Sequence, residues 1–231
     1  MGDLLLIGEP GTGKTLLIKN LLTLDFFKKV VWVTTVRTSK VVRNLITDTF
    51  NGELWVVDIY TRAGRKNLDD RDVIVRNPLN LNEVSLVIGN ALDNVEDDYI
   101  FILDSISGLL LYHSTQQVIH ILRNILLRIE EDDAAAIFTL VKNAHDIHTE
   151  TSISLLFLNV IELDREFLKN EKSVKRYIKI IKAFKYVTPE VTEFTIDKDK
   201  IILPKHIQEF IISSLLSSSS SSLLSSNHFS Q

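Results

Sequence analysis

Cysteine is absent from this 231-residue chain, and glycine, proline and methionine are scarce, at eight, four and one residues. Without cysteine, the chain can form neither a disulfide framework nor a thiolate zinc site. Three of the eight glycines fall within six consecutive positions, 8–13, so the residue that most easily takes unusual backbone angles is concentrated in one short segment.

An excess of positive charge is also lacking. The formal net charge is −4 and the isoelectric point is near 5.9. The chain as a whole therefore has no attraction for nucleic acid or for an anionic membrane, and such binding would need a local basic patch.

Long hydrophobic runs are lacking as well, because no apolar stretch approaches the roughly 18 residues that a membrane-spanning helix needs. The apolar run near the start, Leu4–Ile7, has no basic region before it and is broken by Gly8. We expect no signal peptide and no membrane partner, and we expect the protein to be cytoplasmic.

The hydrophobic content of 45% and the length are sufficient for one sizeable core. We predict a single folded domain over residues 1–212, in which residues 61–82 form a charged loop or excursion. Residues 213–231 are almost entirely serine and leucine, and we expect this low-complexity tail to be disordered, without a catalytic role.

Residues 8–15 match the phosphate-loop pattern G-x-x-x-x-G-K-[ST] throughout, between an apolar strand-like run and a helix-forming segment at 16–22. The glycines allow a tight turn whose N–H groups point inward, and the helix adds its positive end. Lys14 would reach the β- and γ-phosphates, and the Thr15 hydroxyl would bind Mg²⁺. The candidate nucleotide-binding residues of this loop are Gly8, Glu9, Pro10, Gly11, Thr12, Gly13, Lys14 and Thr15.

Apolar segments alternate with helix-like segments up to about residue 161, which predicts a parallel sheet covered by helices. Ser39 is predicted to cap the second helix. The expected strands are 30–34, 54–57, 99–104, 136–141 and a short one near 160, and the main expected helices are 84–95, 117–130 and 153–158.

The strand expected at 99–104 ends on Asp104, which has the form of a Walker B motif. A carboxylate at the carboxyl end of a central parallel strand faces the crevice where such sheets bind ligands. Asp104 is therefore, together with Thr15, a candidate for binding Mg²⁺.

The last third of the chain is ambiguous by periodicity. Arg176–Phe184 and Glu193–Leu203 fit strands, the second with a turn at 197–199, but the apolar residues of the first segment would also form a helix face.

Several segments together resemble the KaiC-like ATPases of the RecA superfamily, a group that includes archaeal RadA paralogues and an archaellum motor protein. The likeness is carried by the loop 8–15, by Phe101–Ser107 and by the closing strands 160–163, 176–184 and 193–203. It implies a RecA-like α/β fold, with a mostly parallel helix-flanked β-sheet and C-terminal β-hairpins. It also implies ATP and Mg²⁺ as cofactors.

The departures from this resemblance concern catalysis. KaiC-like proteins usually carry two glutamates after the second strand, one of which is the general base, and here Val36 and Arg37 occupy those positions. We assign no catalytic residue, since neither side chain accepts a proton from water, and a positioned base contributes roughly 10²–10⁴-fold in rate. Arg37 either contacts the γ-phosphate or points to solvent, and both alternatives remain open at this stage.

The second departure lies in the Lys-x-Arg segment that reaches the neighbouring subunit's nucleotide in this family. Lys182 is retained as a nucleotide-contacting candidate, but Phe184 replaces the arginine. Loss of an arginine finger costs roughly 10³-fold or more in phosphoryl transfer.

Nucleic-acid binding has little support. The loops expected to hold DNA, residues 108–116 and 143–152, contain no arginine or lysine. Residues 165–185 are basic, and a solvated hairpin face explains them better than a nucleic-acid or acidic partner. His145 and His148 have a spacing that is common by chance and do not indicate a metal site.

The resemblance and the departures predict an Mg-ATP-binding protein with slow or absent hydrolysis, acting as a regulatory or accessory factor like a recombinase paralogue in DNA repair. One alternative is an active ATPase whose base is Glu53, Asp58 or a residue of a partner chain, within a homo-oligomer or with a recombinase-like partner. The other is a non-enzymatic module in signalling or a motor complex, in which ATP shapes a partner-binding surface.

Overall fold

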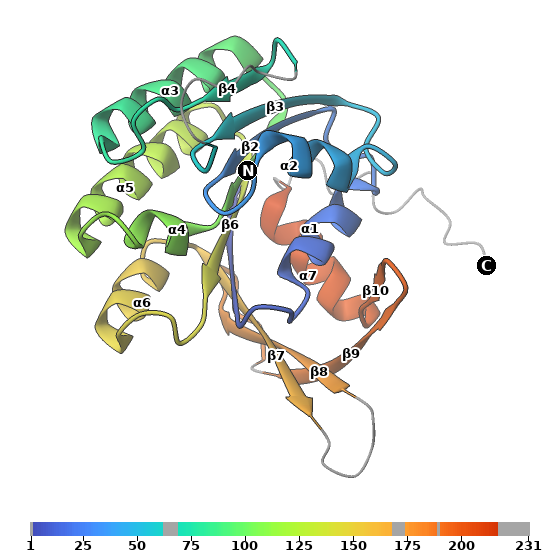
Figure 1. Cartoon of the computed structure of the whole chain (residues 1–231). Coiled ribbons are helices and arrows are strands. Elements are labelled where there is room, and N and C mark those ends of the chain that lie inside the picture. Colours follow the sequence, from blue (N-terminus) through green and yellow to red (C-terminus); the bar gives the residue numbers. More distant parts are fainter. Residues whose placement is uncertain (1, 62–68, 168–173, 189, 217–231) are drawn as a thin grey trace.

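The computed structural model describes residues 2–61, 69–167, 174–188 and 190–216. Figure 1 shows one central β-sheet with helices on both of its faces. The domain that we predict from the sequence contains all the described strands and all but the last turn of the final helix.

All ten described strands join one sheet, in the order β10-β9-β8-β7-β1-β6-β5-β2-β3-β4. The strands from β7 to β4 in this order are parallel, and those from β7 to β10 are antiparallel. Their bounds are β1 Asp3–Gly8, β2 Lys29–Thr34, β3 Glu53–Asp58, β4 Asp72–Ile74, β5 Tyr99–Asp104, β6 Ala135–Val141, β7 Asn159–Phe167, β8 Val174–Lys182, β9 Val191–Asp197 and β10 Lys200–Ile202.

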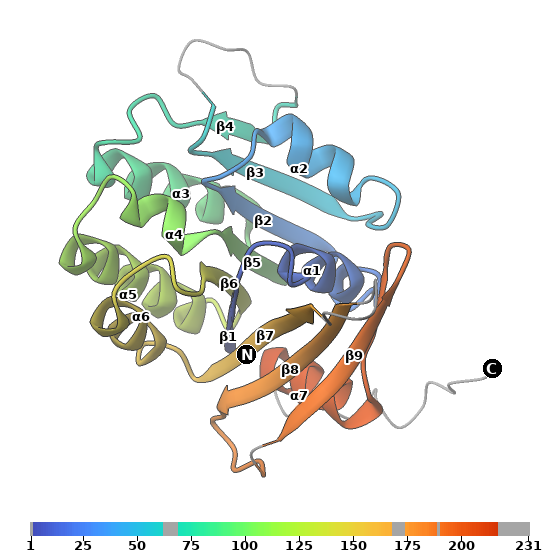
Figure 2. The same ribbon diagram turned by 60° about the horizontal axis from the view of Figure 1, so that its bottom comes forward.

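Helices cover both faces of this sheet, as Figures 1 and 2 show. Buried residues of α3, α4, α5 and α6 belong to one core cluster, and those of α1, α2 and α7 to the other. The bounds are α1 Lys14–Leu22, α2 Ser39–Ile46, α3 Leu81–Val95, α4 Ile106–Leu110, α5 Thr115–Glu131, α6 Ile147–Ser154 and α7 Lys205–Leu215. No helix in the described ranges is both long and apolar enough to cross a bilayer.

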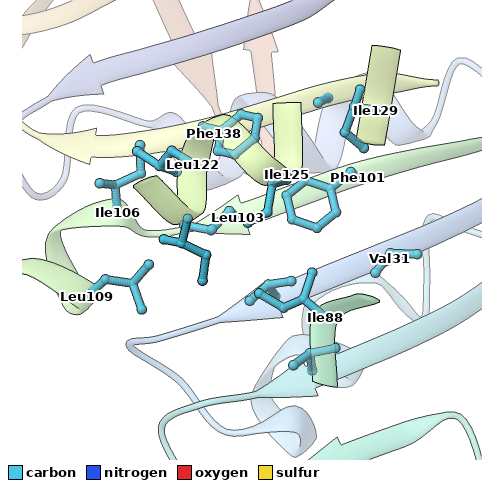
Figure 3. Packing of buried hydrophobic residues seen from close by; sticks show 14 of the residues in the cluster. Val31, Ile88, Phe101, Leu103, Ile106, Leu109, Leu122, Ile125, Ile129 and Phe138 are labelled. Atoms are coloured by element: carbon cyan, nitrogen blue, oxygen red, sulfur yellow. The ribbon is translucent and has the colours of Figure 1, made fainter. Parts of the chain in front are cut away.

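The first core lies between the sheet and α3 and α5. In Figure 3, Phe101 and Phe138 stand on neighbouring strands and meet Leu122 and Ile125 of α5. The two phenyl rings are tilted, with centroids 5.5 Å apart, which is a favourable aromatic arrangement. Because both faces of the strands are covered, their sequences are apolar throughout rather than alternating.

The second core lies on the opposite face, where α7 packs beside α1 (Figure 1). Ile207 and Ile211 of α7 are fully buried there. Neither this helix nor the short helix α4 is among the elements that we predict from the sequence. α7 runs through residues 213–215, which the sequence assigns to the tail, because its apolar face continues to Leu215. Residues 217–231 of the expected tail lie outside the described residues.

The fold class predicted from the sequence is confirmed, including the closing antiparallel strands. Residues 176–182 are strand rather than helix, since β8 pairs with β7 along its length and with β9 at residues 176–179. Asp197 pairs with Lys200 across the turn that joins β9 to β10.

Three local predictions need correction. The segment 61–82 is not all loop, because β4 lies within it and pairs with β3. The helix after β6 spans Ile147–Ser154 rather than 153–158. The cap of α2 is Thr38, whose hydroxyl accepts from the N–H of Val41, while the N–H of Ser39 donates to Asp58.

Candidate functional site

The phosphate loop connects the end of β1 to the start of α1, at the centre of the sheet. Gly11 and Gly13 have φ angles of +83° and +111°, which residues with a side chain rarely adopt. A Cβ atom on Gly8 would lie 2.6 Å from the carbonyl oxygen of Leu163 on β7. The turn therefore depends on glycine both for its backbone angles and for its close approach to the neighbouring strand.

Lys14 is the first residue of α1, and its side chain folds back over the loop. Its ammonium donates to the carbonyl of Gly8, and to that of Glu9 at 3.1 Å. Burial lowers the pKa of Lys14 to about 8, against the opposing effect of Asp104, and Arg37 lowers it further. Lys14 thus lies over the loop, and its contact with the β- and γ-phosphates stays a prediction.

Asp104 lies at the carboxyl end of β5, level with Thr34 of β2 in the register of the sheet. The carboxylate is buried, and its two oxygens have different partners. Oδ1 accepts from the hydroxyl of Thr139 on β6 at 2.8 Å, and Oδ2 accepts from the Arg37 guanidinium at 2.7 Å. Thr139 had no role in the sequence prediction, since a threonine inside a strand carries no signal of its own.

Arg37 reaches the phosphate loop. Its Nη1 atom contacts Asp104 and lies 3.4 Å from the Thr15 hydroxyl. Its side chain is 37% exposed. The sequence leaves two alternatives open for Arg37, a contact with the γ-phosphate or a side chain that points to solvent. The position at the loop is incompatible with the second alternative.

The same contacts test whether Mg²⁺ fits the site as it is built. The predicted metal donors are the Thr15 hydroxyl and the Asp104 carboxylate, and a nitrogen of Arg37 contacts both. A divalent ion prefers oxygen donors that are free to bind it or its waters. In this arrangement the donor set already holds a cationic side chain, so it does not fit Mg²⁺.

Thr35 joins the ends of β2 and β5. Its hydroxyl donates to the carbonyl of Ser105 at 2.7 Å and accepts from the N–H of Ser105 at 2.9 Å. A Cβ atom on Gly108 of α4 would lie 2.2 Å from this hydroxyl oxygen. The backbone beside Asp104 is therefore held by a link that requires glycine at position 108.

The positions that correspond to the expected glutamates supply no base. Val36 is 40% exposed and apolar. The substitutes that the sequence offers within this chain are engaged with other groups. Asp58 is fully buried at the end of β3 and accepts from the N–H groups of Ser39, Tyr60 and Thr61, while Glu53 begins β3 and pairs with Arg71 at 3.1 Å.

Lys182 does not join the phosphate loop of its own chain. It ends β8 beside Val160, at the sheet end where β7 begins, whereas the loop follows the other end of β1. Its ammonium donates to the carbonyls of Leu155 and Phe157 at 3.2 and 2.5 Å. A nucleotide contact by Lys182 would therefore involve another subunit.

Arg165 of β7 is a residue that the sequence analysis assigned only to a basic stretch. A Cβ atom on Gly11 would lie 2.6 Å from its Nη1, so the guanidinium lies against the phosphate loop. Its buried Nε has no hydrogen-bond partner in the described part of the chain. The alternation of side chains along β7 gives the only sequence signal, because Arg165 follows Leu163 on the face that packs on α1.

Three other members of the basic stretch, Lys175, Lys179 and Lys182, contact acidic groups or backbone carbonyls. Lys179 lies 2.9 Å from Glu162 and 3.2 Å from Asp164, and the contact with Glu162 is the main cause that raises its pKa. Lys169 and Lys172 lie outside the described residues. Within the described ranges, no group of three or more histidines and carboxylates could hold a metal ion.

A glycine-bounded phosphate loop after the central strand, with an acidic residue ending β5 and antiparallel strands closing one side of the sheet, defines the RecA type of P-loop nucleotide-binding domain. The chain belongs to the KaiC family of ATPases, because the family model described as "ATPase: KaiC" matches residues 2–207. The family membership that the motifs predict is therefore confirmed.

One similar solved structure is that of the KaiC-like protein PH0186 from the hyperthermophilic archaeon Pyrococcus horikoshii. It has a TM-score of 0.63 and 18% sequence identity, and the match covers 87% of this chain and 88% of that one. At this identity the likeness shows the fold alone. No curated protein matches the sequence significantly.

Proposed function

We propose that the protein binds ATP at residues 8–15 and hydrolyses it slowly or not at all, acting as a regulatory or accessory factor. ATP is abundant in the cytoplasm, where we expect the protein to act. Coordination of Mg²⁺ by Thr15 and Asp104 would require Arg37 to leave both of these groups.

The observation that carries this proposal is the arrangement around Asp104. The loop and its lysine are assembled beside a buried carboxylate, but the residues at the positions of the expected bases are an exposed valine and an arginine paired with that carboxylate. Phosphates bind to such a loop through N–H groups and positive charge, which do not require a base. Hydrolysis needs the attacking water to be positioned and deprotonated.

Calorimetry with ATP and a phosphate-release assay test the proposal together. We expect wild type to bind ATP, Lys14→Ala to bind it much more weakly, and the turnover of both to be near background. Brisk hydrolysis by wild type that is lost in Lys14→Ala would contradict the proposal that hydrolysis is slow or absent. Failure of wild type to bind any nucleotide would contradict the proposal as a whole.

An active ATPase with a base from a partner chain remains the alternative within the same chemistry. Because Lys182 lies at the opposite end of the sheet from its own loop, a role for it in turnover would require a second subunit. Turnover that rises with protein concentration, and that Lys182→Ala lowers, would support this alternative against the slow enzyme.

A nucleotide-dependent interaction module is favoured by a separate observation. A pocket of about 370 Å³ begins at Thr35, next to Asp104, and several of its lining side chains are apolar. The exposed apolar members of the lining are Val36, Tyr60, Leu79, Leu111 and Tyr112. A pull-down with and without ATP tests this function, since a module of this kind should capture partners only in one of the two conditions.

A role in DNA repair, in the manner of recombinase paralogues, belongs to this proposal through the resemblance alone. The lysines at 175 and 179 lie opposite Glu193 and Glu162, so part of the charge that would attract nucleic acid is neutralised. We expect weak binding to single-stranded DNA that disappears at moderate salt.

A further inference from the structure

We propose that Arg37 is a built-in cation of the phosphate site, and that the protein therefore binds nucleotide without magnesium. The inference rests on the proposed function, since it concerns how the same loop holds the nucleotide. It assigns the role of the divalent ion to a side chain of this chain.

The contacts of one guanidinium nitrogen carry the inference. Nη1 of Arg37 lies 2.7 Å from Oδ2 of Asp104 and 3.4 Å from the hydroxyl oxygen of Thr15. These two groups come from different elements, the strand β5 and the helix α1. The positive charge thus lies between the two side chains from which the motifs predict metal coordination.

Both carboxylate oxygens of Asp104 are already engaged, one of them by a cation. Its other oxygen, Oδ1, accepts from Thr139 at 2.8 Å. The carboxylate is buried, so replacement of the charge-assisted bond by a hydrated ion would also require the site to open.

The backbone on either side holds Arg37 in place. The N–H of Arg37 donates to the Thr34 hydroxyl at 3.2 Å, and that hydroxyl donates to the carbonyl of Arg37 at 2.9 Å. The next residue, Thr38, caps α2. Arg37 is therefore held between the end of β2 and the start of α2, and its side chain extends towards α1.

The charges agree with this role. Lys14, Arg37 and Arg165 bring three positive charges to the loop, against the two carboxylates of Asp104 and Glu9. Arginine stays protonated at all physiological pH values. The phosphates of a nucleotide therefore meet a net positive site, which attracts them directly and repels a further cation.

The test is calorimetric titration of ADP and ATP into wild type and Arg37→Gln, each in excess magnesium and in excess EDTA. Arg123→Gln, on the exposed side of α5, is the matched control, and thermal melts establish that each variant is folded. For wild type and the control, we expect dissociation constants that agree within about threefold between the two conditions. For Arg37→Gln, we expect affinity to fall about tenfold or more in EDTA, the size of effect that a lost charge-assisted contact produces, and to recover in magnesium.

A second measurement follows the metal directly. Manganese, used as a spectroscopic probe, should not bind to wild type with ADP and should bind to Arg37→Gln with ADP. Dependence of wild-type affinity on magnesium would overturn the inference and leave the proposed function intact. Binding by Arg37→Gln but not by wild type would show that Arg37 blocks the site, which also overturns it. Absence of nucleotide binding in both proteins under both conditions would overturn the proposed function itself.

Discussion

At the scale of single residues, the buried position of Lys14 makes the phosphate loop sensitive to pH. The ammonium is held by two carbonyls, but burial disfavours its charge and lowers its pKa to about 8. Bound phosphates would stabilise the charged form, so nucleotide binding and protonation of Lys14 favour one another.

We predict that the affinity for ADP falls as the pH rises through 8. The free protein loses the Lys14 proton above that pH and must regain it on binding, which weakens affinity about tenfold between pH 7 and pH 9. Calorimetry in EDTA at several pH values checks this. Lys14→Arg keeps its charge over the whole range and should show little pH dependence. An identical pH profile for wild type and Lys14→Arg would contradict the prediction.

Asp3, at the start of β1, gives a prediction about stability. Burial raises the pKa of its carboxyl to about 6, although the N–H of Leu158 and the charge of Lys182 act against this. The folded state therefore binds more protons than the unfolded state between about pH 4 and pH 6, so this group lowers the free energy of unfolding as pH rises through that window.

The neutral variant Asp3→Asn retains an oxygen that can accept from Leu158 and avoids the buried charge. We expect it to be more stable than wild type at pH 7, by about 1–3 kcal/mol, and equally stable near pH 3. Urea denaturation at the two pH values measures the difference. A variant that is less stable than wild type at pH 7 would show that the charge interaction with Lys182 outweighs burial.

At the scale of elements, α4 and the end of β2 are in direct contact at Gly108. A methyl group there would meet Thr35, which bonds to Ser105 beside Asp104. We predict that Gly108→Ala lowers stability by about 1–3 kcal/mol and weakens nucleotide binding, because the ends of β2 and β5 must move apart.

Gly89 of α3 provides the matched control, since an added Cβ there has nothing within 4 Å. Gly89→Ala should raise stability by up to about 1 kcal/mol, through the better helix propensity of alanine, and should leave binding unchanged. Thermal melts and calorimetry on the pair distinguish local crowding at Thr35 from a general intolerance of alanine.

The elements that the sequence predicts are those with a strong local pattern. The parallel strands β1, β2, β3, β5 and β6 are continuous apolar runs, and such runs are typical of strands buried on both faces. The short elements β4 and α4 are too brief to show a period, and α7 enters a segment whose serines obscure its apolar face. Periodicity alone did not distinguish strand from helix in β8.

The residues of the candidate site divide in the same way, into those with a local sequence pattern and those without one. The phosphate loop is visible as a string, because its residues are adjacent in the sequence. Three further residues reach the site from separate elements: Arg37 from the β2–α2 connection, Thr139 from β6 and Arg165 from β7. Their places therefore depend on strand order and register. Pairing of Arg37 with Asp104 joins positions 67 residues apart, which a single sequence cannot show.

At the scale of the whole molecule, the two cores share one sheet. Leu4 and Leu6 pack on one face of β1, while Leu5 and Ile7 pack on the other. A strand cannot leave one core without breaking the other, so we expect the described domain to unfold in a single transition.

The two tryptophans allow a test of this cooperativity. Trp32 is buried in the core that contains α1 and α7, and Trp55 packs against the opposite core. In Trp32→Phe and in Trp55→Phe, the remaining fluorescence should change at the same denaturant concentration as the circular dichroism of that variant. Separate midpoints within either variant would show that one layer of helices detaches first.

The order of the strands also has a consequence for association between molecules. Among the strands that the structure describes, the two at the margins of the sheet, β4 and β10, are the shortest, with three residues each. An unpaired margin of that length offers few backbone groups to a second chain, and the exposed Lys200 places a charge on β10. Copies of this protein would therefore meet through side-chain surfaces, and a continuous sheet running from one molecule into the next is disfavoured.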